Sequence, residues 1–165
     1  MTQGGVPAIE IVGEWFRCVS LHRDPLSFEG ARLMGGRLNS VGEPALYLAQ
    51  TPTLAVAENL RLGSLFGIDR FPPRLLVTVE VTLKRVVDLR EAATCALLGV
   101  SQHELSAEWR LATALSRTQR LGTQLGEMGF EGVLVPSTLE PTSANLAVLV
   151  RNIELADCVK VVGAD

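Results

Sequence analysis

The stretch RLLVTVEVTLK, residues 74–84, has the most regular pattern in the chain and decides its class of fold. Every second side chain from Leu75 to Leu83 is apolar, and the residues between them include two threonines and a glutamate. This period of two is typical of a β-strand, because successive side chains point to opposite faces of a sheet. We therefore predict a strand here, with one face in the core and the other partly exposed to water.

Shorter apolar segments on both sides of this strand predict further elements. Strands are expected over residues 15–19, 45–49, 132–135, 146–150 and 158–162. Helices are expected over residues 52 to about 66, 91–98, 102 to about 116, and from there to about 128. Thr51 and Ser101 suit the helix N-caps, because a side-chain oxygen accepts a backbone N–H of the first turn. The order of elements predicts a single mixed α/β (α+β) domain without internal repeats.

The composition indicates one globular domain. The chain has 165 residues, 47% of them apolar and 20% charged, which is long enough for a core and too short for two full-sized domains. We expect the domain over residues 14–165 and a flexible N-terminal lead over residues 1–13. The formal net charge of -3 does not favour a broad nucleic-acid surface, and no apolar run approaches the roughly 20 residues of a membrane span.

The cysteines and histidines predict neither a disulfide framework nor a metal site. Cys18, Cys95 and Cys158 are an odd number with no paired spacing, which favours a reducing, cytoplasmic location. His22 and His103 are far apart and lack the close spacing of zinc ligands. We therefore expect no protein-bound metal.

Two arginines occupy positions that suit an anion. Arg17 lies inside the apolar segment 15–19, where a charge needs a partner or a ligand. Arg37 follows Gly35-Gly36, a context that lets the backbone approach a ligand and presents a bidentate donor for phosphate. A surface salt bridge is the ordinary alternative for Arg37.

Glu58 is the candidate acidic group of the predicted helix that follows Thr51. It shares a helical face with Ala55 and Leu62, so we expect its carboxylate to face inward. An inward carboxylate needs a reason, and the ordinary one is a pair with Arg61.

Three more polar residues lie within or at the ends of predicted strands. Tyr47 lies inside the segment 45–49, Ser137 follows the strand that ends at Val135, and Asn145 begins the next strand. Each also has an ordinary structural role, as a core aromatic residue for Tyr47 and as a turn or capping residue for the other two.

In combination these residues resemble the RES domain family, named for its Arg, Glu and Ser residues and found in bacterial toxin–antitoxin modules. The resemblance covers roughly residues 16–150. It is carried by Phe16-Arg17-Cys18-Val19, Gly35-Gly36-Arg37-Leu38-Asn39 with Gly42, Leu46-Tyr47-Leu48-Ala49, Ala55-Val56-Ala57-Glu58, Thr118-Gln119-Arg120-Leu121-Gly122, Val135-Pro136-Ser137 and Asn145. The chain departs from the family at Leu38, where Trp is usual, and at Leu146, where an aromatic residue often follows the asparagine.

The resemblance implies a fold similar to that of ADP-ribosyltransferases and an enzyme that breaks the nicotinamide–ribose bond of NAD+, with phosphate or water as acceptor. It implies catalytic roles for Glu58, Arg37 and Tyr47, and NAD+ binding by Arg17, Arg37, Tyr47, Ser137 and Asn145. Glu58 would stabilise the cationic ribose, the arginines would bind the pyrophosphate, and Tyr47 would border the nicotinamide. No separate cofactor is implied, since NAD+ is the substrate and inorganic phosphate the candidate co-substrate. The family also implies an Xre-like antitoxin as partner.

Two alternatives stay open. The same pocket would serve a mono-ADP-ribosyltransferase that modifies a protein. From a different class, a binding module is conceivable, because Arg110, Arg117 and Arg120 fall at spacings that place them near one helical face, as in a basic stripe for nucleic acid or an acidic partner. A solvated surface is the ordinary explanation of that stripe. Hydride transfer is disfavoured, because the chain lacks the G-x-G-x-x-G fingerprint.

Overall fold

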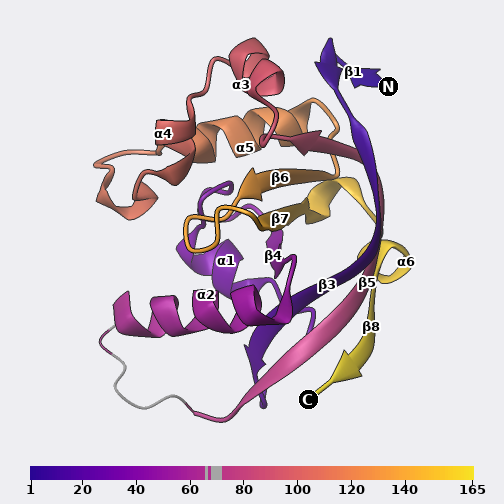
Figure 1. Ribbon diagram of the computed structural model, residues 1–165, viewed down its shortest axis with the longest axis vertical. Coiled ribbons are helices and arrows are strands. Elements are labelled where there is room, and N and C mark those ends of the chain that lie inside the picture. Colours follow the sequence, from indigo (N-terminus) through magenta and orange to yellow (C-terminus); the bar gives the residue numbers. More distant parts are fainter. Residues whose placement is uncertain (66, 68–71) are drawn as a thin grey trace.

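The computed structural model describes residues 1–65, 67 and 72–165 (Figure 1). The strands are β1 Thr2–Gln3, β2 Val6–Pro7, β3 Ile9–Ser20, β4 Ala45–Ala49, β5 Arg74–Asp88, β6 Gly132–Pro136, β7 Ala144–Leu149 and β8 Val159–Ala164. The helices are α1 Glu29–Met34, α2 Pro52–Leu65, α3 Ala92–Leu98, α4 Gln102–Ser106, α5 Arg117–Glu127 and α6 Leu155–Cys158, with 3-10 turns η1 Trp109–Leu111 and η2 Val150–Asn152. The prediction of a mixed α/β domain is confirmed.

The main sheet closes on itself. Its strand order is β3-β4-β7-β6-β5-β8, and β3 also pairs with β5 over most of its length. Strands β3, β4, β7, β6 and β5 therefore form a ring, and β8 joins the outer edge of β5. Only the pairing of β5 with β6 is parallel among the pairings of the described strands. In Figure 1 the long curved β3–β5 pair runs along one side of the molecule.

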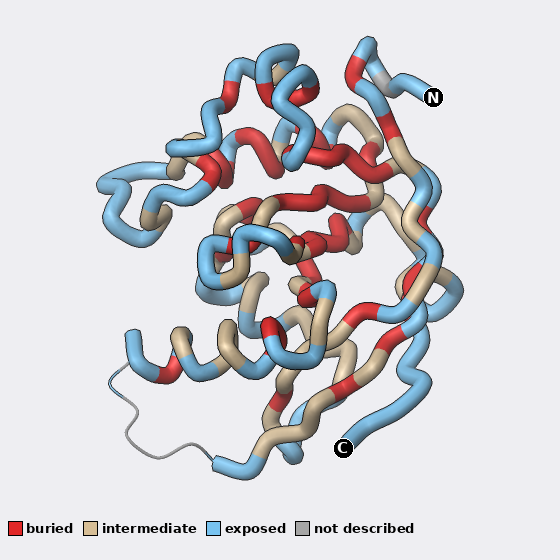
Figure 2. The backbone as a smooth tube through the Cα atoms, viewed as in Figure 1, coloured by how far each residue is buried: buried red, intermediate tan, exposed pale blue. Residues whose placement is uncertain are grey.

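Two apolar clusters pack on opposite faces of these strands. The inner cluster fills the ring with residues such as Trp15, Leu46, Val79 and Leu146. The outer cluster packs alternate residues of β6 and β7 against α3, α4 and α5. Figure 2 shows the buried residues concentrated on the central strands, between the helices. In this arrangement, loops and helix α2 lie beside the carboxyl end of β6 and the start of β7.

The strand predicted over residues 74–84 is confirmed. Val77, Val79, Val81 and Leu83 are 0% exposed, whereas the residues at positions 80, 82 and 84 are exposed. The strand is longer than predicted because β5 continues to Asp88, where β6 replaces β8 as its neighbour.

The helix caps are confirmed, but one helix end is wrong. Thr51 accepts the Leu54 N–H, and Ser101 forms a capping box with Glu104. The helix begun by Ser101 was expected to reach about Ser116, but α4 ends at Ser106. The chain leaves helical geometry there because the carbonyls of Leu105 and Ala107 accept a guanidinium from a distant loop. The predicted end of α2 near Phe66 lies outside the described residues.

The N-terminal lead expected over residues 1–13 does not lie apart from the domain. Residues 2–7 form the β1–β2 hairpin, and β3 begins at Ile9. Ile9 and Ile11 pair with β5 and pack against the inner cluster. Their alternating apolar side chains extend the strand that was predicted to begin at Trp15.

Candidate active site

Hydrogen bonds of the buried Asn39 amide and of the Tyr47 hydroxyl hold the loop that carries Arg37. Asn39 is 1% exposed, and its Nδ2 donates to the backbone carbonyls of Ala31 at 2.8 Å and Glu43 at 3.0 Å. The Tyr47 hydroxyl donates to Asn39 Oδ1 at 2.7 Å and accepts the Leu38 N–H at 3.0 Å. Burial raises the pKa of Tyr47 well above its ordinary value, so the phenol stays protonated. The Tyr47 hydroxyl therefore holds the loop, and the contact of Tyr47 with nicotinamide stays a prediction.

Helix α5 supports the same loop from the other side. A Cβ atom on Gly122 would meet the Leu38 carbonyl carbon at 2.5 Å, with the carbonyl oxygen closer still. Only glycine allows this approach of backbone to backbone. Gln119 is buried and donates its Nε2 to the Asn39 carbonyl at 3.3 Å. The motif 118–122 therefore seats the Arg37 loop on α5.

Arg37 reaches from this loop to the segment after α4. Its Nη1 donates to the carbonyls of Leu105 and Ala107, both at 2.7 Å. Burial lowers the pKa of Arg37, and the nearby Glu108 and Glu58 partly offset that effect while Arg61 adds to it. Both hydrogen bonds that Arg37 makes to described residues leave from Nη1. The Nε and Nη2 groups are thus the donors that remain for an anion.

Glu58 and Asn145 form a hydrogen-bonded pair between α2 and β7. Asn145 Nδ2 donates to Glu58 Oε1 at 3.0 Å, so the amide orients a half-buried carboxylate through one of its oxygens. The predicted helical face is right for Ala55, which is 4% exposed, and wrong for Leu62, which is 41% exposed. Glu58 lies at the border of the buried face of α2 rather than at its centre. Leu62, one turn further along the helix, therefore points outward.

Arg61 is a functional candidate that the sequence reasoning missed. It was considered only as a partner for Glu58, but its Nη2 lies 3.5 Å from Glu108 Oε2 instead. Its Nη1 donates to Thr138 Oγ1 at 2.7 Å. The spacing of three residues after Glu58 was the available signal, since it places both side chains on one side of α2. Nothing in the local sequence indicated Glu108 or Thr138.

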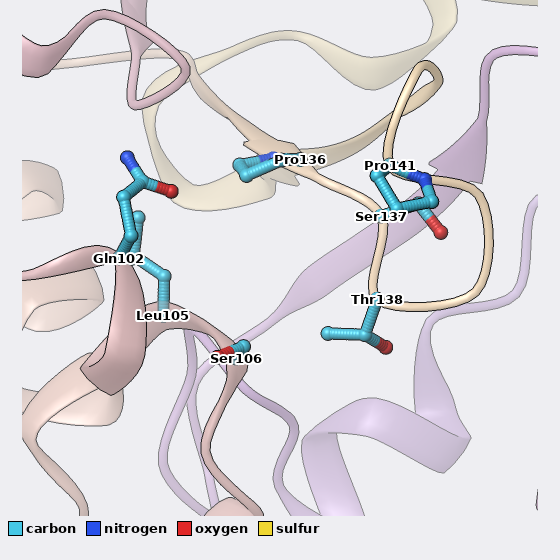
Figure 3. Close-up of a pocket in the computed structure, with 7 residues that line it drawn as sticks. All are labelled: Gln102, Leu105, Ser106, Pro136, Ser137, Thr138 and Pro141. Atoms are coloured by element: carbon cyan, nitrogen blue, oxygen red, sulfur yellow. The ribbon is translucent and has the colours of Figure 1, made fainter.

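A cavity of about 260 Å³ adjoins these side chains (Figure 3). It lies between α4 and the loop after β6, and it is lined by Gln102, Leu105, Ser106, Pro136, Ser137, Thr138 and Pro141. Ser137 is buried and accepts the N–H groups of Leu139 and Glu140, so its hydroxyl shapes the turn and keeps its proton for another acceptor. Val135 pairs with Asn145, which places Ser137 close to the Glu58–Asn145 pair.

The structure does not bring the Arg17 guanidinium into this group. Its Nη1 donates to the carbonyls of Pro25 at 2.9 Å and Ser27 at 3.1 Å. Burial lowers the pKa of Arg17 to about 10, and Asp24 partly offsets the effect. Phe16 packs toward α2, so Arg17 leaves β3 on the opposite face. Arg17 holds the loop that follows β3, and its contact with a pyrophosphate stays a prediction.

The basic stripe proposed for a binding module is not a single helical face. Arg110 lies in η1, whereas Arg117 and Arg120 lie in α5. Arg117 donates to the carbonyls of Leu98 and Gly99, and Arg120 donates to that of Leu115. The helix predicted to align them ends too early, so the stripe gives no support to a nucleic-acid interface.

Within the described residues, His, Cys, Asp and Glu side chains form no group of three or more that could hold a metal ion. Within the same part of the chain, none of the helices combines the length and the apolar character needed to cross a bilayer.

The site belongs to a mixed α/β domain in which a loop arginine lies near a helix glutamate, beside a cavity between α4 and the loop after β6. The chain matches the RES domain over residues 14–164 and belongs to that family. Sequence recognition from the Arg, Glu and Ser motifs is thereby confirmed.

Relatives in the family are named as toxins. The chain is 30% identical over 131 residues to Toxin Res of Yersinia enterocolitica serotype O:8 / biotype 1B, covering 78% of this chain and 77% of that protein. It is 29% identical over 151 residues to the NAD(+) phosphorylase MbcT of Mycobacterium tuberculosis, covering 83% and 77%. A chain in the crystal structure of the M. tuberculosis MbcT–MbcA toxin–antitoxin complex superposes with a TM-score of 0.79 at 25% identity, covering 96% of this chain and 85% of that one.

Proposed function

We propose that this RES protein consumes NAD+ by cleaving the bond between nicotinamide and ribose, with phosphate or water as the acceptor. The observation that carries the proposal is the Glu58 carboxylate, which Asn145 holds by a hydrogen bond and which lies near the Arg37 guanidinium. The name of the mycobacterial relative, an NAD(+) phosphorylase, supports the same chemistry. The proposal requires no metal or separate cofactor, because NAD+ is the substrate.

Glu58 provides the electrostatic stabilisation in this mechanism. Breaking the N-glycosidic bond builds positive charge on the ribose, as in glycoside hydrolysis, and nicotinamide leaves as a neutral molecule with the bonding electron pair. A carboxylate beside the ribose stabilises that charge most strongly when its orientation is fixed beforehand. The Asn145 amide supplies this orientation by donating to Oε1, which leaves Oε2 for the ribose.

Arg37 binds the substrate and holds the site together at the same time. Its Nη1 secures the carbonyls of Leu105 and Ala107, and its remaining donors suit a pyrophosphate oxygen. Ser137, close to the Glu58–Asn145 pair, retains a hydroxyl proton for the ribose or the carboxamide. In this proposal Tyr47 acts behind the Arg37 loop, as a positioning residue rather than a catalytic one.

Nicotinamide release from NAD+ by the purified chain tests the proposal. Arg37→Ala and Glu58→Gln are each expected to lower the rate at least about a hundredfold, the scale for losing one electrostatic stabiliser. Glu127→Gln, an exposed position at the end of α5, is the matched control and should keep the wild-type rate. Wild-type rates in both site variants, or no nicotinamide release by the wild-type chain, would refute the assignment.

The products decide between the acceptors. Free ADP-ribose indicates water, ADP-ribose 1″-phosphate indicates phosphate, and a protein in a lysate that gains ADP-ribose indicates the transferase alternative. We also propose an antitoxin as partner, of the Xre-like kind that the family resemblance implies; the structural neighbour comes from a toxin–antitoxin complex.

A further inference from the structure

Two guanidinium groups pair with one carboxylate near the cavity that Thr138 lines. The Glu108 carboxylate lies 3.5 Å from Arg61 and 3.0 Å from Arg110, and it also accepts the Arg110 backbone N–H. Arg37 is close enough for an electrostatic effect on both Glu108 and Arg61. Glu108 is thus the shared counter-ion of Arg61 and Arg110.

The contacts of Glu108 are weak enough for an anion of higher charge to displace its carboxylate. Its contact with Arg61 is longer than the roughly 2.7–2.9 Å of a strong charge-assisted hydrogen bond. The two side chains are 26% and 32% exposed, so water screens their attraction. Although burial opposes ionisation, hydrogen bonds from Arg110 keep the pKa of Glu108 below its ordinary value, so it is an anion at neutral pH.

Thr138 supplies a further polar group beside Arg61. Its hydroxyl accepts a hydrogen bond from Arg61 Nη1 at 2.7 Å and retains its own proton for another acceptor. Thr138 also lines the cavity of about 260 Å³, so a molecule bound to Arg61 has room beside it (Figure 3). Arg61 follows Glu58 by three residues and lies on the same side of α2.

From these contacts we infer that Arg61, Arg110 and Thr138 form a binding site for a phosphate group, which Glu108 occupies when no ligand is bound. The planar forks of two arginines and a hydroxyl donor match the oxygens of a phosphate dianion, which carries more charge than a carboxylate. The ligand is either inorganic phosphate or the pyrophosphate of a dinucleotide, since both present the same oxygens.

The placement beside Glu58 gives inorganic phosphate a direct role, which rests on the proposed function. A phosphate oxygen would form the bond to ribose C1″ as the bond from C1″ to the nicotinamide nitrogen breaks. The electron pair of the broken bond stays with nicotinamide, and HPO4²⁻ gives up its proton to solvent. No oxidant or reductant is involved, and the products are neutral nicotinamide and ADP-ribose 1″-phosphate.

Binding without turnover provides the first test. Phosphate should raise the thermal midpoint of the wild-type chain more than sodium chloride of equal ionic strength does. Glu108→Gln removes the carboxylate that competes with phosphate for the arginines. Half of the maximal rise in the thermal midpoint should therefore appear at a several-fold lower phosphate concentration. Arg61→Gln should abolish the effect. An equal response of all three proteins to phosphate and to chloride would overturn the inference, whatever happens to NAD+.

Kinetics distinguish the two phosphate sources. If inorganic phosphate is the ligand, Arg61→Gln should raise the KM for phosphate at least tenfold and change the KM for NAD+ less than threefold. If the ligand is the pyrophosphate, the KM for NAD+ rises instead. Arg85→Gln is the matched control, because Arg85 forms a comparable 3.4 Å pair with Glu131, and neither residue lines the cavity. Unchanged values of both constants in Arg61→Gln would contradict the site, whereas a wild-type chain inactive on NAD+ would contradict only the proposed reaction.

Discussion

Substituting Gly122 by alanine should disturb the Arg37 loop without replacing any polar side chain of the site. The added Cβ would lie 2.5 Å from the Leu38 carbonyl carbon, whereas ordinary contacts begin near 3.4 Å. The loop must therefore retreat from α5 by at least about 1 Å, because the carbonyl oxygen lies closer still. Leu38 is 1% exposed and Gly122 lies in the middle of α5, so neither partner can move toward solvent without opening the core.

The expected loss has two parts. Overpacking of a core contact costs about 1–3 kcal/mol. The same retreat stretches the hydrogen bond from Gln119 Nε2 to the Asn39 carbonyl, now 3.3 Å, beyond its range and costs about 1 kcal/mol more. The free energy of unfolding should thus fall by about 2–4 kcal/mol. A displacement of about 1 Å at Arg37 should also slow nicotinamide release on the order of a hundredfold.

Urea unfolding and nicotinamide release measure the two effects on the same protein. Gly30→Ala is the matched control, because Gly30 lies in α1 and a Cβ there meets only the Arg23 side chain at 4.0 Å. That control should be neutral, or more stable by up to about 1 kcal/mol. If Gly122→Ala does not fold, Gln119→Ala keeps the reasoning testable, with a loss of about 1 kcal/mol and a slower reaction. Wild-type stability and rate in Gly122→Ala would refute the role assigned to α5.

Two further predictions concern the partly buried Tyr47 and the buried Asp88 carboxylate. Tyr47→Phe leaves the Leu38 N–H and Asn39 Oδ1 without a partner, so the free energy of unfolding should fall by about 1–3 kcal/mol, while nicotinamide release should fall less than in Arg37→Ala. An unchanged unfolding free energy would instead favour a ligand contact for the hydroxyl. Although burial opposes ionisation, hydrogen bonds from Arg90 lower the pKa of Asp88. Its stabilising effect is present above the ordinary Asp pKa of ~3.9 and lost as the pH falls through the lower folded value, so Asp88→Asn should reduce the acid dependence of urea unfolding; an unaltered pH profile would count against this pair.

The strands were predictable because their signal is local. The period of two in β5 and the hydroxyl caps of α2 and α4 depend on neighbouring residues, and the structure agrees with each of them. The end of α4 was not predictable in that way. It depends on Arg37, which precedes Leu105 by 68 residues in the sequence and takes the carbonyls that a longer helix would have used.

The site residues differ in the same way, because some have a local sequence signal and others depend on distant partners. Arg37 and Glu58 were identified from their context and from the family resemblance, and the structure places them near each other. The contact of Tyr47 with nicotinamide stays a prediction, and the sequence gives no sign that its hydroxyl meets Asn39. Arg61 was overlooked because its partners, Glu108 and Thr138, come from segments far away in the chain.

The two departures from the family pattern can now be placed in the structure. Leu38, where Trp is usual, is 1% exposed and packs in the outer cluster against α5, and it does not line the cavity beside Ser137 and Thr138. Leu146 is 0% exposed and lies in the inner cluster, on the face of β7 opposite Asn145. Neither substitution removes a polar group from the site. Leu38, which is smaller than Trp, therefore acts through the packing that sets the distance between the Arg37 loop and α5. Gly122→Ala perturbs the same distance.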